Sequence, residues 1–276
     1  MSLSLTKFNP KKIEERRING PGPATCVFIG KRGTGKSTLV ADILYSIRKI
    51  QAGVAISATE DGNEFYSNFI PDILIHSEYK PDIIQQVINR QKRAIQGNKE
   101  NNSNDVFVLL DDCMYDKKMI RDTNIRGIFM NGRHWRITFM LTMQYCMDLP
   151  PDLRSNIDYV FILRENIIQN QEKIYKNFFG IFPQFSVFQD VLNSCTEGYD
   201  CLVLDNTSKS NKIQDCVFWY RAKPNRNFKI GTKELWNYCR KNYDKKKAKN
   251  EIDYDEKKLK KKNATSVVVK KLKDKK

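Results

Sequence analysis

The stretch that decides the fold reads Ala24-Thr25-Cys26-Val27-Phe28-Ile29-Gly30-Lys31-Arg32-Gly33-Thr34-Gly35-Lys36-Ser37. It opens with an apolar run of strand length, continues with the pattern G-x-x-x-x-G-K-S, and leads into residues 38–50, where apolar residues recur at helical spacing. Strand, glycine-rich loop and helix in this order predict a P-loop. A glycine-rich turn without a ligand is the alternative, but it gives Lys36 no role.

The residue types of this loop fit the binding of a nucleotide triphosphate. Glycines let the backbone curl so that several N–H groups converge on phosphate oxygens, and the following helix directs its positive end at the same anion. Lys36 is expected to reach the β- and γ-phosphates, and the Ser37 hydroxyl to ligate Mg²⁺. The predicted nucleotide-binding residues are Gly30, Lys31, Arg32, Gly33, Thr34, Gly35, Lys36, Ser37 and Thr38.

A second acidic motif follows the apolar run at residues 106–110. Asp111 and Asp112 end this run, which is typical of a buried strand of the Walker B kind. Asp111 is expected to hold Mg²⁺, and Asp112 to orient or deprotonate the attacking water. An acidic helix cap after a core strand is the alternative explanation.

Three further polar residues are candidates for catalysis. Gln144 ends another apolar run, residues 137–143, and its amide can contact phosphate and water together as a sensor. Arg133 and Arg154 each lie just before a predicted strand, so either could be an arginine finger that reaches a neighbouring subunit's nucleotide. We prefer Arg133, because His134 and Trp135 beside it resemble interface residues. A polar strand end and surface salt bridges are the alternatives.

Composition limits the class of protein. The 276 residues suffice for one sizeable α/β domain with extensions, and a net charge of +16 indicates a polyanionic partner. Seven scattered cysteines without a C-x-x-C pair indicate a reducing compartment, and two histidines argue against a histidine zinc site. Neither a signal peptide nor an apolar run of membrane-spanning length is present, so we expect a soluble protein.

The rest of the sequence predicts further strands and helices of an α/β fold, and it divides the chain into three segments. Strands are expected at 54–58, 158–163, 200–205 and 215–220, the last two as a hairpin; helices at 79–93, 116–131, 166–179, 185–195 and 233–242; loops at 59–63 and 96–104. The parts are a basic lead-in, residues 1–23, that becomes ordered only as it reaches the first strand; a P-loop ATPase domain, residues 24–244; and a tail, residues 245–276.

The tail has 14 lysines against five acidic residues, a net charge of +9. Such a segment is predicted to be disordered when free, and to hold DNA phosphates or direct nuclear import. A solubilising tail is the alternative.

With these motifs in order, the chain resembles the genome-packaging ATPases of nucleocytoplasmic large DNA viruses, a viral branch of the FtsK–HerA superfamily. The resemblance spans roughly residues 24–220. It rests on the P-loop, on Leu110-Asp111-Asp112, on Asn131-Gly132-Arg133-His134, on Thr142-Met143-Gln144 and on Leu153-Arg154-Ser155-Asn156.

The resemblance implies an α/β fold with an additional strand between the P-loop and Walker B strands, sheet order 5-1-4-3-2, and helices on both faces. It implies a ring homo-oligomer, a hexamer or pentamer, that uses ATP and Mg²⁺ to drive double-stranded DNA into a capsid. It assigns phosphate and metal contacts to Lys36, Ser37 and Asp111, catalysis to Asp112, sensing to Gln144 and the finger to Arg133. The wider superfamily often has glutamate at the position of Asp112.

The resemblance also implies capsid or membrane-associated virion proteins as further partners. The expected location is the host cytoplasm, in a viral factory, or the nucleus, or the virion itself. Three other functions compete: a helicase-like or segregation ATPase, a P-loop kinase acting on a small molecule, and a nucleotide-gated scaffold. The kinase leaves Asp112, Gln144 and the basic tail without a role.

Overall fold

The computed structural model describes residues 3–97, 104–113, 119–145 and 149–243. The strands are β1 (Thr25–Ile29), β2 (Ala52–Ser57), β3 (Ile75–His76), β4 (Val106–Asp111), β5 (Ile137–Met143), β6 (Tyr159–Ile162), β7 (Asp200–Asp205) and β8 (Val217–Arg221). The helices are α1 (Lys11–Asn19), α2 (Lys36–Ser46), α3 (Glu60–Asn63), α4 (Pro81–Gly97), α5 (Thr123–Asn131), α6 (Pro151–Arg154), α7 (Ile168–Phe178), α8 (Phe185–Cys195), α9 (Ile213–Cys216) and α10 (Lys233–Asn242).

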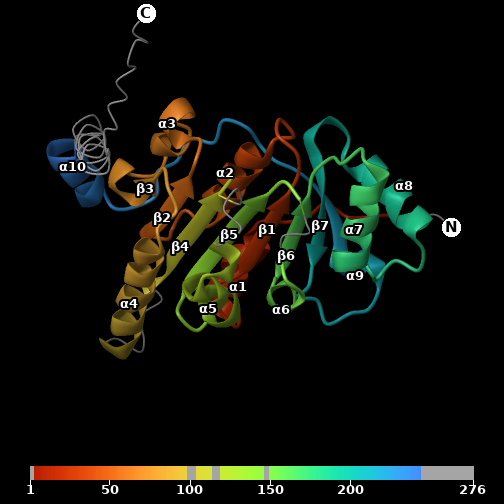
Figure 1. The fold of residues 1–276 in the computed structure, drawn as a ribbon, viewed down its shortest axis with the longest axis horizontal. Coiled ribbons are helices and arrows are strands. Elements are labelled where there is room, and N and C mark those ends of the chain that lie inside the picture. The colour runs from red at the N-terminus through yellow and green to blue at the C-terminus, as the bar shows by residue number, and fades with distance from the viewer. Residues whose placement is uncertain (1–2, 98–103, 114–118, 146–148, 244–276) are drawn as a thin grey trace, which may run out of the picture.

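The strands form one sheet in the order β3-β2-β4-β5-β1-β6-β7-β8 (Figure 1). Strands β1 to β6 are parallel, while β7 and β8 are antiparallel additions beyond β6. β5 lies between the P-loop strand β1 and the Walker B strand β4, as an additional-strand fold requires. Counted without β3, the strands β6-β1-β5-β4-β2 follow the predicted order 5-1-4-3-2. The whole sheet differs from that order because β3 extends one edge and the β7–β8 hairpin the other.

Successive side chains of the buried strands point alternately into two apolar layers, one on each face of the sheet. Val27 and Ile29 of β1 face the layer formed with α4, α5, α7 and α8, whereas Cys26 and Phe28 face the layer formed with α1 and α2. Figure 1 shows α4, α5 and α7 in front of the sheet and α2 behind it. Because successive side chains of a strand point to opposite faces, a sheet covered on both sides needs continuously apolar strands. This arrangement explains why β1, β4 and β5 lack the alternating polar residues of a half-exposed strand.

The lead-in is folded where the structure describes it, so the prediction that residues 1–23 become ordered only at the first strand is wrong. Helix α1 lies within this segment, and Phe8 and Ile13 are buried. The Phe8 ring meets the rings of Tyr159 and Phe161 edge-on, with centroids 5.6 Å apart in both pairs. Burying two such side chains contributes roughly 1.5–3 kcal/mol each and helps to order this basic segment.

Other boundaries shift for local reasons. The predicted helix 116–131 starts later in its described part, because the Asp122 side chain accepts the Asn124 N–H at 2.7 Å and caps α5; a 3₁₀ turn, Met119–Arg121, precedes it. The predicted strand 215–220 begins at Val217, after the short helix α9, and the predicted loop 59–63 contains α3. Most of the predicted loop 96–104 and the entire lysine-rich tail lie outside the described residues.

The described helices include none that is both long and apolar enough to cross a membrane. The six cysteines within the described ranges carry free thiols.

Candidate nucleotide site

The P-loop has the predicted strand–loop–helix context, from the end of β1 to the start of α2. Gly33 and Gly35 have φ values of 78° and 95°, in the left-handed region that favours glycine. The Gly30 N–H donates to the Met143 carbonyl of β5 at 3.1 Å, and the Thr34 hydroxyl donates to the Lys31 carbonyl at 2.7 Å. These bonds fix the loop at both ends and leave the first N–H groups of α2 directed at the space above it.

Gly30 is also required for packing. A Cβ at this position would lie 2.8 Å from Thr34 Oγ1 and 2.9 Å from the Leu163 Cβ of the segment after β6. Lys31 directs its ammonium away from the loop, to Glu165 Oε1 at 2.6 Å. Burial opposes ionisation of Glu165, but the hydrogen bond from Lys31 prevails, so the pKa of this carboxyl is lowered. Lys31 therefore serves the loop through its backbone and anchors it to the end of β6.

The Lys36 ammonium lies within the loop that it follows. Its Nζ donates to the Gly30 carbonyl at 2.7 Å and to the Lys31 carbonyl at 3.1 Å, and the residue is 8% exposed. Burial lowers the pKa of Lys36, and the nearby Asp112 and Asp111 oppose that shift. A partly desolvated cation held by two neutral carbonyls can exchange them for phosphate oxygens with a large gain in charge-assisted hydrogen bonding.

Asp111 ends β4 in a buried position. The Thr142 hydroxyl of β5 donates to its Oδ1 at 2.8 Å, and the Ser57 hydroxyl of β2 donates to its Oδ2 at 3.4 Å. Burial raises the pKa of Asp111, and the Thr142 hydrogen bond counteracts part of that shift. These two hydrogen-bond donors are neutral, and the nearby Lys36 ammonium compensates only part of the negative charge of the carboxylate. A cation bound beside it would correct that imbalance.

Asp112 is the first residue after β4 and has a φ of 54°. Left-handed backbone at a residue other than glycine costs on the order of 1–3 kcal/mol and is concentrated at functional sites. The Asp112 N–H donates to Thr142 Oγ1 at 2.9 Å, and Gln144 Nε2 donates to Asp112 Oδ1 at 3.1 Å. The structure therefore joins the predicted water-orienting carboxylate to the predicted sensor, with Thr142 between the two aspartates.

These groups surround an open cleft of about 680 Å³ at the carboxyl ends of the parallel strands. Ligands of open α/β sheets bind at this edge. The cleft is lined by Arg32, Gly33, Gly35, Lys36, Ser37, Thr38, Ala58, Thr59, Gly62, Asn63, Asp111, Asp112 and Tyr199. Gly30, Lys31 and Thr34 support the loop from outside the lining.

Tyr66 is a site residue that no sequence motif identifies. It lies in the 3₁₀ turn Tyr66–Asn68 and is 1% exposed, and its hydroxyl interacts with the side chains of Asp111 and Ser37. Burial, and then the negative charge of Asp111, raise the pKa of Tyr66 well above its ordinary value. The Glu60 carboxylate fixes the turn by accepting the Tyr66 N–H at 3.0 Å. The Tyr66 hydroxyl thus lies beside both predicted metal ligands, Asp111 and Ser37.

The two candidate arginine fingers lie at the opposite edge of the sheet. Arg133 is exposed in the turn before β5, and Arg154 is the last residue of α6, before β6. Because β1, β5 and β6 are parallel and the P-loop follows the end of β1, both arginines are a full strand length from the nucleotide cleft of their own chain. Neither can contact a nucleotide in that cleft, so a catalytic role for either requires a neighbouring subunit and stays a prediction.

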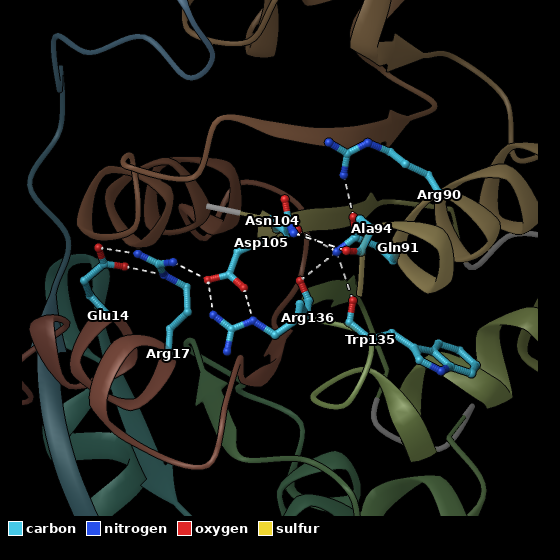
Figure 2. A network of polar contacts seen from close by, with 9 residues as sticks. All are labelled: Glu14, Arg17, Arg90, Gln91, Ala94, Asn104, Asp105, Trp135 and Arg136. Carbon is cyan, nitrogen blue, oxygen red and sulfur yellow. Dashed lines mark hydrogen bonds and ion pairs between the residues drawn. The ribbon is translucent and has the colours of Figure 1, made fainter. Parts of the chain in front are cut away.

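The turn that carries Arg133 is anchored by a buried ionic network (Figure 2). Asp105, just before β4, lies between two guanidinium groups: that of Arg17 from α1, and that of Arg136, whose Nε is 2.5 Å from Asp105 Oδ1. Glu14 completes the network by accepting from Arg17 at 2.8 Å. Gln91 of α4 donates to the Trp135 carbonyl at 3.0 Å. The network ties the segment before β5 to α1, β4 and α4.

Comparison with known proteins gives a consistent set of relatives. The family model described as Poxvirus A32 protein matches residues 21–181. Uncharacterized protein L437 of Acanthamoeba polyphaga mimivirus is 40% identical over 225 residues, 79% of each chain. Uncharacterized protein 075L of Invertebrate iridescent virus 6 is 37% identical over 253 residues, 90% of this chain and 97% of that protein.

Two groups of solved structures share the fold. The genome packaging NTPase B204 of Sulfolobus turreted icosahedral virus 2, in complex with AMPPCP, superposes with a TM-score of 0.52 at 16% identity and covers 79% of this chain and 100% of its own. The pCW3 conjugation coupling protein TcpA with ATPgS gives a TM-score of 0.51 at 12% identity, over 80% of this chain and 70% of its own. The predicted fold class is therefore confirmed.

Proposed function

The chain belongs to the family of the poxvirus A32 protein, and from that premise we propose that it is an ATP-hydrolysing motor that packages double-stranded viral DNA into a capsid. The observation that carries the hydrolytic role is the contact of Gln144 Nε2 with Asp112 Oδ1 at 3.1 Å, beside the P-loop cleft. The packaging role is supported by the shared fold with a protein described as a genome packaging NTPase.

Hydrolysis here relies on positioning and on charge. The P-loop N–H groups and Lys36 hold the triphosphate, so that the γ-phosphate faces the end of β4. Asp112 orients the attacking water and accepts its proton, and Gln144 holds the carboxylate in place through its amide N–H. An arginine from the adjacent subunit, with Arg133 preferred over Arg154, stabilises charge that develops on the transferred phosphoryl group.

Magnesium fits the donors present at this site. Within the described ranges no three His, Cys, Asp or Glu side chains are grouped to hold a metal by themselves, and Mg²⁺ is usually held by one or two protein ligands plus substrate phosphates. Asp111 and the Ser37 hydroxyl would be those ligands, with the buried Tyr66 hydroxyl beside both. When bound, the ion neutralises charge on the β- and γ-phosphates.

The positions of the candidate fingers support a ring of identical subunits. The cleft and the candidate fingers lie at opposite edges of one chain, so a site that includes Arg133 or Arg154 needs two chains. The net charge of +16, with +9 in the tail, suits contact with DNA phosphates by counterion release. We propose a hexamer or pentamer that acts during virus assembly in the infected cell, in a cytoplasmic viral factory, in the nucleus or on the virion, with capsid or membrane-associated virion proteins as further partners.

The test is the steady-state rate of ATP hydrolysis at increasing protein concentration, with and without long double-stranded DNA. We expect the rate per subunit to rise steeply with concentration and again with DNA, and the Lys36→Ala variant, prepared in parallel, to report any contaminating ATPase. A flat rate that ignores DNA would contradict the motor and favour the kinase or the scaffold. Separation of the strands of a forked duplex during hydrolysis would favour the helicase.

A further inference from the structure

An exposed aromatic residue forms one wall of the nucleotide cleft without a role in the chemistry above. Tyr199 is 72% exposed, the highest value among the large hydrophobic side chains that the structure describes. It lines the P-loop cleft and also a smaller adjoining pocket of about 170 Å³. Single exposed apolar residues are common on protein surfaces, so the position of Tyr199 at the cleft, rather than its exposure alone, indicates a role.

The ring of Tyr199 lies against the phosphate loop. A Cβ at Gly35 would be 3.3 Å from Tyr199 Cδ1, so the ring is in close reach of the loop backbone. Tyr199 therefore lies beside the P-loop, and a planar group of a ligand whose phosphates are held by the loop could contact the exposed face of its ring.

The backbone conformation that positions the Tyr199 ring is energetically unfavourable. Gly198 and Tyr199 have consecutive positive φ values, 54° and 72°, and for tyrosine this conformation is unfavourable. Neighbouring contacts fix the turn: the Thr196 hydroxyl donates to the Leu192 carbonyl at 2.7 Å, and Arg221 forms an ion pair with Asp200. A strained turn that is anchored on both sides indicates a side chain whose direction matters.

The strand order places Tyr199 at the nucleoside end of the cleft. Asp111 ends β4, which lies on one side of β1 with β5 between them. Tyr199 immediately precedes β7, which lies on the other side of β1 with β6 between them, and β7 is antiparallel, so it starts at the P-loop edge. With the γ-phosphate directed at Asp111 and Asp112, Tyr199 lies on the opposite side of the P-loop, where the sugar and base have room to extend.

The small pocket beside the ring has the size of a single planar group. Its lining is Gly33, Thr34, Arg164, Thr196, Gly198, Tyr199 and Asp200. Its volume, about 170 Å³, is below the roughly 300–1,000 Å³ of pockets that enclose whole ligands, so it suits part of a larger molecule. Base rings stack on aromatic side chains in offset geometry, and purines offer the larger surface.

From these observations we propose that Tyr199 is the platform on which the purine base of the bound nucleotide stacks, with the adjoining pocket as the base subsite. The proposal rests on the proposed ATPase function, and it makes Tyr199 a determinant of nucleotide affinity. The residue holds the base and takes no part in phosphoryl transfer.

The experiment measures Mg²⁺-dependent binding of ATP and of inorganic tripolyphosphate by calorimetry. Loss of base stacking in Tyr199→Ala should weaken ATP binding about five- to 150-fold, while binding of tripolyphosphate, which has no base, stays unchanged. Tyr199→Phe retains the ring and should retain the preference for ATP. Tyr238→Ala removes another exposed tyrosine, 56% exposed on α10, and should alter neither affinity.

Each other outcome has a distinct meaning. Equal ATP affinity of Tyr199→Ala and wild type would overturn the base platform. An equal loss for both ligands would show that the ring supports the phosphate loop, which also overturns it, and Tyr199→Phe guards against misfolding as the cause. If the wild-type protein binds neither ligand, the proposed ATPase function fails and the platform fails with it.

Discussion

A buried aspartate lies at each end of strand β4, and the two aspartates have different partners. Asp105 and Asp111 are both 3% exposed. Asp105 lies between the guanidinium groups of Arg17 and Arg136, so its charge is matched by two cations (Figure 2). Asp111 accepts hydrogen bonds from the uncharged hydroxyls of Thr142 and Ser57, interacts with the hydroxyl of Tyr66, and has the Lys36 ammonium as a nearby positive charge that forms no ion pair with it within the described residues.

The difference shows that the two edges of one sheet have different roles: one edge contributes to stability and the other to ligand binding. A buried carboxylate that is fully paired is strongly destabilising to disrupt, because its partners would be left charged and desolvated. A buried carboxylate held only by neutral donors costs free energy in the empty protein and recovers it when a cation arrives. The amino edge of the sheet is therefore built to stay closed, and the carboxyl edge is built to accept a ligand.

Substitution of Arg133 is expected to have the largest effect. A catalytic role of Arg133 in a neighbouring subunit would mean that the amino edge also takes part in chemistry. Arg133→Ala should lower turnover by about 10³–10⁵, the usual value of an arginine finger, and leave ATP binding intact. Mixing this variant with wild type should lower the rate according to the subunit ratio. Arg154→Ala is the matched comparison. If mixed rings show no dependence on the ratio of Arg133→Ala to wild-type subunits, Arg154 becomes the better candidate.

Asp112 tests the catalytic role of the carboxyl edge. Asp112→Asn preserves the shape of the side chain and removes the base, so turnover should fall by about 10²–10⁴ while ATP affinity is retained. Turnover from hydrolysis assays and affinity from calorimetry separate the two effects. The control is Asp190→Asn, at an exposed position on α8. Normal turnover of Asp112→Asn would remove this residue from the mechanism.

Lys36 tests the binding of phosphate at the same edge. Lys36→Ala removes the cation that the loop holds at 2.7 Å from the Gly30 carbonyl, and we expect ATP binding to be abolished, a loss of about 2–5 kcal/mol or more. Lys49→Ala, at an exposed lysine beyond the end of α2, is the matched control and should bind normally. Tight ATP binding by Lys36→Ala would count strongly against the site.

The pH dependence of stability gives the smallest effect. The folded pKa of Asp111 lies above its ordinary value of 3.8, so between these two values the folded chain retains a proton that the unfolded chain has released. Stability must therefore fall as pH rises through this window. Denaturant unfolding in the presence of a chelator should show this fall in wild type and a shallower one in Asp111→Asn. Parallel pH profiles would mean that Asp111 is adequately compensated.

The sequence predicted the parts of the site that belong to ordered motifs. Lys36, Asp111, Asp112 and Gln144 meet because the strand order of an additional-strand P-loop fold brings the ends of β1, β4 and β5 together. That order depends on the buried, parallel strands, whose apolar runs are visible in the sequence. The assignment of Arg133 to a neighbour's site stays a prediction, because it concerns a contact between chains.

The residues that sequence reasoning missed act through contacts between distant segments. Arg17 and Asp105 are 88 positions apart, and no local pattern announces that they form a pair. Helix α1 was missed because its buried residue Ile13 is surrounded by charged residues, so it has no apolar stripe. Tyr66 and Tyr199 come from 3₁₀ turns, where neither helical nor strand periodicity applies.

The most direct test of the central claim compares Asp105→Asn with Asp111→Asn by thermal unfolding, each with and without ATP and Mg²⁺. We expect Asp105→Asn to lose about 3–5 kcal/mol of stability in the empty protein, because Arg17 and Arg136 lose their shared partner. Asp111→Asn should be at least as stable as wild type when empty, yet lose the stabilisation that ATP and Mg²⁺ give. Equal destabilisation of the empty protein by both substitutions, with ligand stabilisation retained in Asp111→Asn, would contradict the account.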